Sequence, residues 1–151
     1  MVLALLLLLA QDHRVPVPPI EDVPGLPRVL LIGDSISIGY SVPVRNLLAG
    51  VANVHRIPGN GATSANGVLL VEDWLRKEKW DVIHFNFGLH DLKRLEDGAP
   101  QVDIADYERY LGLFVQRLKR TGARLVFATT TPVPEGKVSP PRRSEDVVRY
   151  N

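Results

Sequence analysis

The sequence predicts an α/β fold in which a parallel sheet is covered by helices on both faces. Short apolar runs alternate with longer segments of helical character four times along the 151 residues. The first run, Arg28–Ile32, shows no alternation of apolar and polar residues, which is typical of a strand buried on both faces. Strands that alternate with helices join into parallel sheets through crossover connections. The order of elements therefore predicts a layered α/β domain.

Four strands are expected, each a short run rich in β-branched, aliphatic or aromatic residues. Polar residues interrupt the third run at His84 and Asn86. We expect His84 to point into the packing of the sheet and to be structural. The predicted strands are Arg28–Ile32, Val51–Ile57, Val82–Phe87 and Leu125–Thr130.

Four helices are expected between and after these strands. The clearest spans Ile104 to Thr121, because its apolar residues recur at the 3.6-residue spacing and Gly122 follows it. A helix over Ser37–Leu48 is expected to start near Pro43, since proline favours the first turn of a helix. The remaining predictions are a loop over Gly59–Gly67, a helix over Val68–Lys77, a loop over Pro132–Pro141 and a helix that opens at Ser144.

Composition and charge exclude several classes of function. The net charge is +1 and the basic residues are scattered, so nucleic acid is not an expected partner. The chain has no cysteine, which excludes disulfides, thiolate metal sites and a cysteine nucleophile. Neither H-x-H nor H-E-x-x-H spacing occurs, and the phosphate-loop and dinucleotide fingerprints are absent. We therefore expect no metal and no cofactor.

The first 27 residues differ from the rest of the chain. Residues 1–10 are uncharged and leucine-rich, which is typical of the apolar part of a signal peptide and too short to cross a bilayer. Residues 11–27 contain five prolines and are predicted to be a linker or an extended arm. The sequence thus predicts an exported protein without stable membrane insertion, whose folded domain covers residues 28–151.

Glycines and polar residues follow each predicted strand. In open parallel sheets, ligands bind beyond the carboxyl ends of the strands, so these residues are expected to converge on one site. The helix-to-strand connections on the opposite edge are poorer in both kinds of residue. The strand-end segments are Gly33-Asp34-Ser35, Gly59-Asn60-Gly61, Gly88-Leu89-His90-Asp91 and Thr129-Thr130-Thr131.

Each of these segments, taken alone, has a simpler explanation. Ser35 lies between a strand and a helix, where a nucleophile would be exposed beside free helix N–H groups, but serine is also a common helix cap. His90 could donate to an oxyanion or act as a base, although single histidines are usually structural. Gly59 and Gly61 could present backbone N–H groups to an anion, or could only turn the chain.

Taken together, the segments resemble the sequence blocks of the SGNH/GDSL hydrolases over Arg28 to Asn151. Gly33-Asp34-Ser35 resembles the first block, with Ile36 in place of leucine; Gly61-Ala62-Thr63-Ser64 resembles the second; and Gly88-Leu89-His90-Asp91 occupies the place of G-x-N-D. The resemblance implies a three-layer α/β/α, flavodoxin-like fold with a parallel sheet. It also implies Ser35 as nucleophile and Gly61, or alternatively Gly59, as oxyanion N–H donor. His90 would be an oxyanion donor in place of asparagine, and Gly33, Asp34, Gly88 and Asp91 would have supporting roles.

The sequence departs from the family pattern in two respects. His90 stands where the family has asparagine, as in a G-L-H-D variant of the third block. The D-x-x-H block, which supplies the base and its orienting acid, is absent, and no histidine follows His90. A serine without a base is a poor nucleophile. We therefore expect a C-terminally truncated domain, incomplete by about one strand and two helices, with little activity of its own.

The function that the resemblance implies is hydrolysis of a carboxylic ester through an acyl-Ser35 intermediate. With an export signal, an O-acetyl group on a polysaccharide is a reasonable substrate, and other small-molecule esters stay open. A second hypothesis is a carbohydrate-binding module that uses the same edge without catalysis. A third, a flavodoxin-like cofactor binder, is disfavoured because the Gly59-Asn60-Gly61 loop does not match G-x-G-x-x-G.

Overall fold

The computed structural model describes residues 17–151 and shows four parallel strands in one sheet. The strand order across the sheet is β2-β1-β3-β4, so β1 and β3 are central and β2 and β4 form the edges. The predicted leader, residues 1–10, lies outside the described residues, as does the start of the linker. The strands are β1 (Arg28–Ile32), β2 (Asn53–Arg56), β3 (Val82–Asn86) and β4 (Arg124–Ala128).

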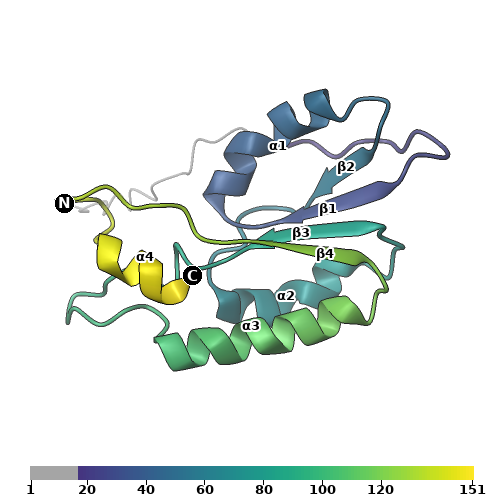
Figure 1. Cartoon of the computed structure of the whole chain (residues 1–151). Helices are drawn as coiled ribbons and strands as arrows, with labels where there is room; N and C mark the ends of the chain where they lie inside the picture. Colours follow the sequence, from purple (N-terminus) through teal and green to yellow (C-terminus); the bar gives the residue numbers. More distant parts are fainter. Residues whose placement is uncertain (1–16) are drawn as a thin grey trace, which may run out of the picture.

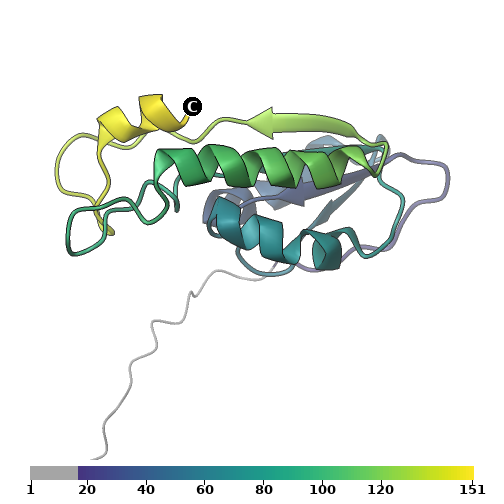
Figure 2. The same ribbon diagram turned by 90° about the horizontal axis from the view of Figure 1, so that it is seen from below.

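Helices cover both faces of the sheet, which confirms the predicted fold class. In Figure 1, α1 lies on one face and α2 and α3 lie on the other, while α4 lies beyond the carboxyl ends of the strands. Figure 2 shows α2 and α3 lying side by side on the face of the sheet that they cover. The helices are α1 (Ser35–Leu47), α2 (Ser64–Leu75), α3 (Ile104–Lys119) and α4 (Ser144–Tyr150). No helix within residues 17–151 is long and apolar enough to cross a membrane.

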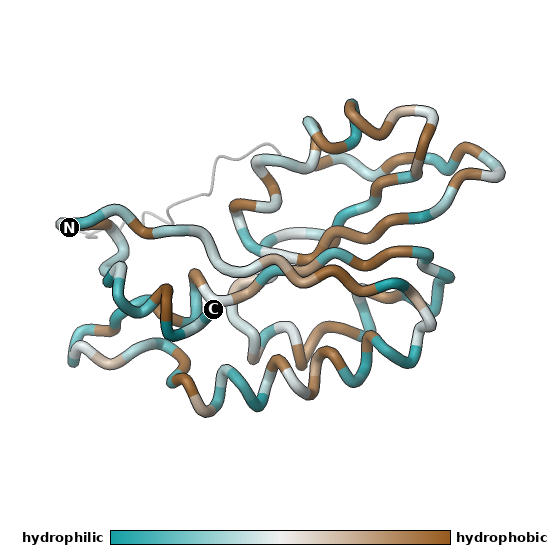
Figure 3. Tube along the Cα trace, in the orientation of Figure 1, coloured by the Kyte–Doolittle hydropathy of each residue, from teal (hydrophilic) through white to brown (hydrophobic). Residues whose placement is uncertain are grey.

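The main core lies between the sheet and the pair α2 and α3. Ile83 and Phe85 of β3 point to this side and pack with Phe114 of α3, and all three are at most 2% exposed. Figure 3 shows the apolar residues concentrated along the central strands. Burial of this apolar surface is the principal stabilising term of the fold. Edge strand β4 is less covered, with Val126 and Phe127 both about 40% exposed.

Two predicted helix starts are wrong. The first helix begins at Ser35, not near Pro43, because the Asp34 side chain caps it by accepting a hydrogen bond from the Ile36 N–H. Pro43 lies inside that helix. The second helix begins at Ser64 within the predicted loop, because the Thr63 hydroxyl caps it.

The arm over residues 17–27 docks against edge strand β2. The side-chain amide of Asn53 exchanges two hydrogen bonds with the backbone of Val23, at 2.9 and 3.0 Å. Arg45 of α1 donates to the Pro18 carbonyl at 2.7 Å, and His55 contacts Asp22 at 2.6 Å. This part of the proline-rich segment is thus an arm fixed to the domain.

Candidate active site

Ser35 is the first residue of α1, directly after the turn that leaves β1. The preceding Asp34 is 3% exposed, and its Oδ1 atom accepts the Ile36 N–H at 2.9 Å. Ser35 itself is only half-buried. No residue within 17–151 accepts a hydrogen bond from the Ser35 backbone N–H, as expected at the first turn of a helix. The turn therefore presents a hydroxyl beside a free N–H and the positive end of a helix dipole.

Gly61 lies against the same turn. Its N–H donates to the Gly33 carbonyl at 3.0 Å, and a Cβ at this position would be 2.8 Å from that carbonyl oxygen. Only glycine fits this close approach. The N–H that the resemblance assigns to the oxyanion is thus engaged in this structure, and it could stabilise an oxyanion only if this hydrogen bond opens. The alternative, Gly59, is exposed and has a φ of +67°.

The third strand-end segment is fixed by the buried side chain of Asp91. Its Oδ1 atom accepts the backbone N–H of Ser64 at 2.9 Å and the Ser64 hydroxyl at 2.6 Å, while its Oδ2 atom accepts the Gly88 N–H at 3.0 Å. Burial raises the pKa of Asp91, against the effect of these hydrogen bonds. Asp91 therefore ties the end of β3 to the start of α2. Gly88 has a φ of +125°, which favours glycine.

His90 approaches the nucleophile turn. Its Nε2 atom lies 3.8 Å from Oδ2 of Asp34, and its side chain is 26% exposed. Burial lowers the pKa of His90, Asp34 opposes this effect, and Arg142 adds to it. The ring is therefore held toward its neutral form, which keeps one N–H donor and one acceptor nitrogen. Either role proposed for His90, oxyanion donor or base, is chemically open to it.

Arg56, at the end of β2, is a site residue that the sequence analysis missed. Its guanidinium donates to the carbonyls of Gly33 and Asp34, both at 3.1 Å, and to the Ser37 hydroxyl. It also donates to the carbonyls of the second strand-end loop, Ile57 at 2.7 Å and Gly59 at 2.5 Å. One side chain thus joins the turn that carries Ser35 to the loop that carries Gly61.

Arg142 is a second missed residue. It belongs to the loop between β4 and α4, and it donates to the Leu89 carbonyl at 2.7 Å. Its charge acts on both His90 and Asp34, and burial lowers its own pKa. No pattern in the sequence distinguishes either arginine from an ordinary surface cation, because each acts through backbone carbonyls of distant segments.

The other two histidines among residues 17–151 lie away from this edge. His84 packs edge-on against Tyr40 beneath α1, and its buried Nδ1 atom has no hydrogen-bond partner within the described residues. His55 pairs with Asp22 on the outer edge of the sheet. Among residues 17–151, no side chain accepts a hydrogen bond from the Ser35 hydroxyl, and no group of three or more histidine or acidic residues could hold a metal.

Several solved structures are similar to this chain in three dimensions. The acetyl xylan esterase AlAXEase superposes over 82% of the chain with a TM-score of 0.68 at 18% identity. The lipase/acylhydrolase from Enterococcus faecalis superposes over 83% of the chain with a TM-score of 0.67 at 20% identity. A catalytic mutant of Axe2, an acetylxylan esterase from Geobacillus stearothermophilus, superposes over 82% with a TM-score of 0.59 at 17% identity.

The chain has an SGNH/GDSL hydrolase-like fold. It spans 68%, 67% and 71%, respectively, of the length of those three structures. No protein-family profile matches the sequence, and no curated protein matches it. At these identities the SGNH-like similarity establishes the architecture, and the chemistry has to be argued from the site itself.

Proposed function

We propose that this chain carries the nucleophile and oxyanion part of a serine ester hydrolase. The observation that supports this most directly is the meeting of three strand-end segments. The Gly61 N–H contacts the Gly33 carbonyl at 3.0 Å, and His90 Nε2 lies 3.8 Å from Asp34. Ser35 projects from the same turn, so the residues that the resemblance names share one edge of the sheet.

In this proposal the Ser35 hydroxyl attacks the carbonyl carbon of an ester, and the alcohol leaves to give an acyl-Ser35 intermediate that water hydrolyses. Negative charge develops on the carbonyl oxygen and is stabilised by donors aimed at it. The free N–H of Ser35 and the N–H of His90 supply such donors, and the charge of Arg142 stabilises the same region. Gly61 joins them when its hydrogen bond to Gly33 opens.

The substrate that we favour is an O-acetyl ester on a polysaccharide. Two of the similar structures are acetyl xylan esterases by name, and Ser35 is only half-buried at the edge of the sheet. Export of the protein is a further proposal, which rests on the apolar segment 1–10. Secretion of a fusion to a reporter enzyme would test it.

The decisive experiment is labelling with a fluorophosphonate probe, applied to this chain and to the longest natural form of the protein. We expect Ser35→Ala to abolish labelling. The matched control is Ser144→Ala, because Ser144 is also the first residue of a helix but lies exposed at α4. Where the probe labels the unmodified protein, equal labelling of Ser35→Ala would refute the nucleophile assignment.

One observation favours a second function, a carbohydrate-binding module without catalysis. Within the described residues no base contacts the Ser35 hydroxyl, and the Gly61 N–H is occupied. A folded protein that binds oligosaccharide but is not labelled by the probe would establish this alternative.

A further inference from the structure

A cavity of about 870 Å³ lies on the outer side of edge strand β2, away from the β4 edge. Its walls are the arm over residues 17–22, α1, the loop Ile57–Asn60 and the end of α2. Trp74 and Trp80, each at most 5% exposed, contribute apolar surface. The volume is within the usual range of small-molecule sites. All of these walls lie within the described residues.

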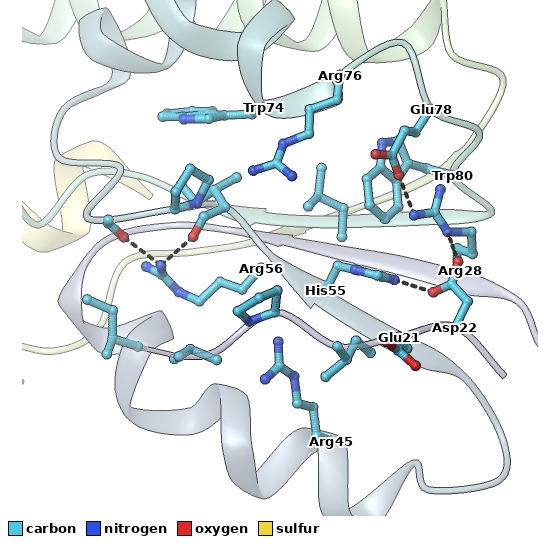
Figure 4. Close-up of a pocket in the computed structure, with 18 of the residues that line it drawn as sticks. Glu21, Asp22, Arg28, Arg45, His55, Arg56, Trp74, Arg76, Glu78 and Trp80 are labelled. Atoms are coloured by element: carbon cyan, nitrogen blue, oxygen red, sulfur yellow. Dashed lines mark hydrogen bonds and ion pairs between the residues drawn. The ribbon is translucent and has the colours of Figure 1, made fainter. Parts of the chain in front are cut away.

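Four arginines from four different elements line this cavity, and Figure 4 shows how they are arranged. Arg28, at one end, pairs with two carboxylates, Asp22 and Glu78. The other three, Arg45, Arg56 and Arg76, have no carboxylate partner within residues 17–151.

The lining carries four arginines against three carboxylates, so one positive charge is in excess. Burial lowers the pKa of both Arg45 and Arg56, and the hydrogen bonds that they make go to uncharged oxygens. Glu21, the third carboxylate of the lining, is exposed and has no cationic partner within residues 17–151. A surplus of partly desolvated positive charge in a concave site favours an anion over water.

Arg76 is the cation best placed to bind a ligand. It caps the end of α2 with a left-handed backbone, φ +53°, and none of its guanidinium nitrogens has a hydrogen-bond partner within the described residues. Figure 4 shows its side chain pointing into the cavity from the α2 side, while Arg45 points in from α1. Guanidinium groups bind carboxylate and phosphate oxygens in pairs, through parallel hydrogen bonds.

We propose that this cavity binds a sugar-sized organic anion through its carboxylate or phosphate group, with Arg76 and Arg45 as the principal contacts. The proposed contacts Arg76 and Arg45 do not touch the Ser35 turn, although the Gly59-Asn60 wall continues to Gly61 and Arg56 borders both sites. The proposal holds whether or not Ser35 is a nucleophile, because the anion is recognised by the arginines of the β2 edge.

Calorimetric titration of the 151-residue chain with glucose, glucuronate and glucose 6-phosphate tests the proposal. The three probes share one ring and differ in charge, so the two anions distinguish carboxylate from phosphate recognition. We expect at least one anion to bind saturably and glucose not to bind. Ser35→Ala should leave the affinity unchanged, which separates this site from the proposed esterase activity.

Arg76→Ala should weaken binding of the anion about tenfold, as expected for loss of a charge-assisted contact. The matched control is Arg120→Ala, because Arg120 is also an exposed arginine that caps a helix, at the end of α3 and outside the cavity lining. Its affinity should equal that of the unmodified chain. Absence of saturable binding by both anions, equal binding of glucose, or equal effects of the two substitutions would overturn the proposal.

Discussion

Arg56 provides a direct test of how the site is held together. Replacement by lysine keeps the positive charge but removes the planar fork that reaches two loops at once. Replacement by alanine removes every contact. The carbonyls of Ile57 and Gly59 have no other donor within the described residues, whereas the Gly33 carbonyl keeps the Gly61 N–H and the Asp34 carbonyl keeps the Ser37 hydroxyl.

The expected magnitude follows from those partners. A buried hydrogen bond from a charged donor contributes about 1.5–3 kcal/mol to stability. Arg56 is half-buried, so water can replace part of each lost hydrogen bond and the cost per bond is smaller. Loss of the contacts to two loops should therefore lower the free energy of unfolding by about 2–3 kcal/mol for Arg56→Ala. Arg56→Lys should lower the free energy of unfolding by roughly half as much, because the lysine ammonium still reaches some of the carbonyls.

Urea denaturation of this chain measures the free energy of unfolding. The rate of fluorophosphonate labelling, in a protein that the probe labels, reports on the geometry at Ser35. Arg45→Ala is the matched control, since Arg45 lines the same β2 edge and donates to the Val54 and Pro18 carbonyls but not to the Ser35 turn. We expect the labelling rate to fall for both Arg56 variants and to stay unchanged for Arg45→Ala. Equal labelling rates in all three variants would refute the positioning role of Arg56.

Two further outcomes can be measured on the chain itself. Gly67→Ala should lower the free energy of unfolding by about 1–2 kcal/mol, because its Cβ would lie 2.6 Å from the Phe87 ring. The added Cβ of Gly112→Ala meets no atom within 4 Å, so this variant should raise the free energy of unfolding by roughly 0.5–1 kcal/mol. Equal urea midpoints for the two variants would contradict this packing. Burial lowers the pKa of His84 and His90 below 6.5, the ordinary value of a histidine, so the unfolded chain binds more protons and stability should fall as the pH drops below 6.5. Unfolding free energies that are equal at about pH 7.5 and pH 5.5 would show that these histidines are not held neutral.

The sequence predicted the architecture well because the strands and the longest helix have unambiguous patterns. The apolar stripe of α3 places Phe114 and Leu118 in the core, where both are fully buried. The starts of α1 and α2 were misplaced because proline and glycine suggested boundaries, while the caps Asp34 and Thr63 decided them. A capping side chain acts over two or three residues, and its effect is not visible in hydrophobic periodicity.

The candidate site was predictable only where backbone geometry demands particular residues. Gly61 has to be glycine because it touches the Gly33 carbonyl, and such requirements leave a readable pattern. Arg56 and Arg142 leave no such pattern in the sequence. An arginine that donates to backbone carbonyls needs only a long charged side chain, and its neighbours in the sequence are not constrained. Their partners are set by the sheet order, which brings the ends of β1 and β2 side by side. That information is tertiary and not local.

The hydrogen bonds that hold the site in shape do not involve the group that would activate Ser35. Arg56 and Asp91 join the three strand-end segments entirely through groups within residues 17–151, with Arg56 linking β1 to β2 and Asp91 linking β3 to α2. A base for Ser35 is not among these groups. The geometry that would stabilise an oxyanion can therefore form independently of the group that would activate the serine. It follows that binding and stability experiments on this chain test the scaffold, whereas only a form that reacts with the probe can test the activation of Ser35.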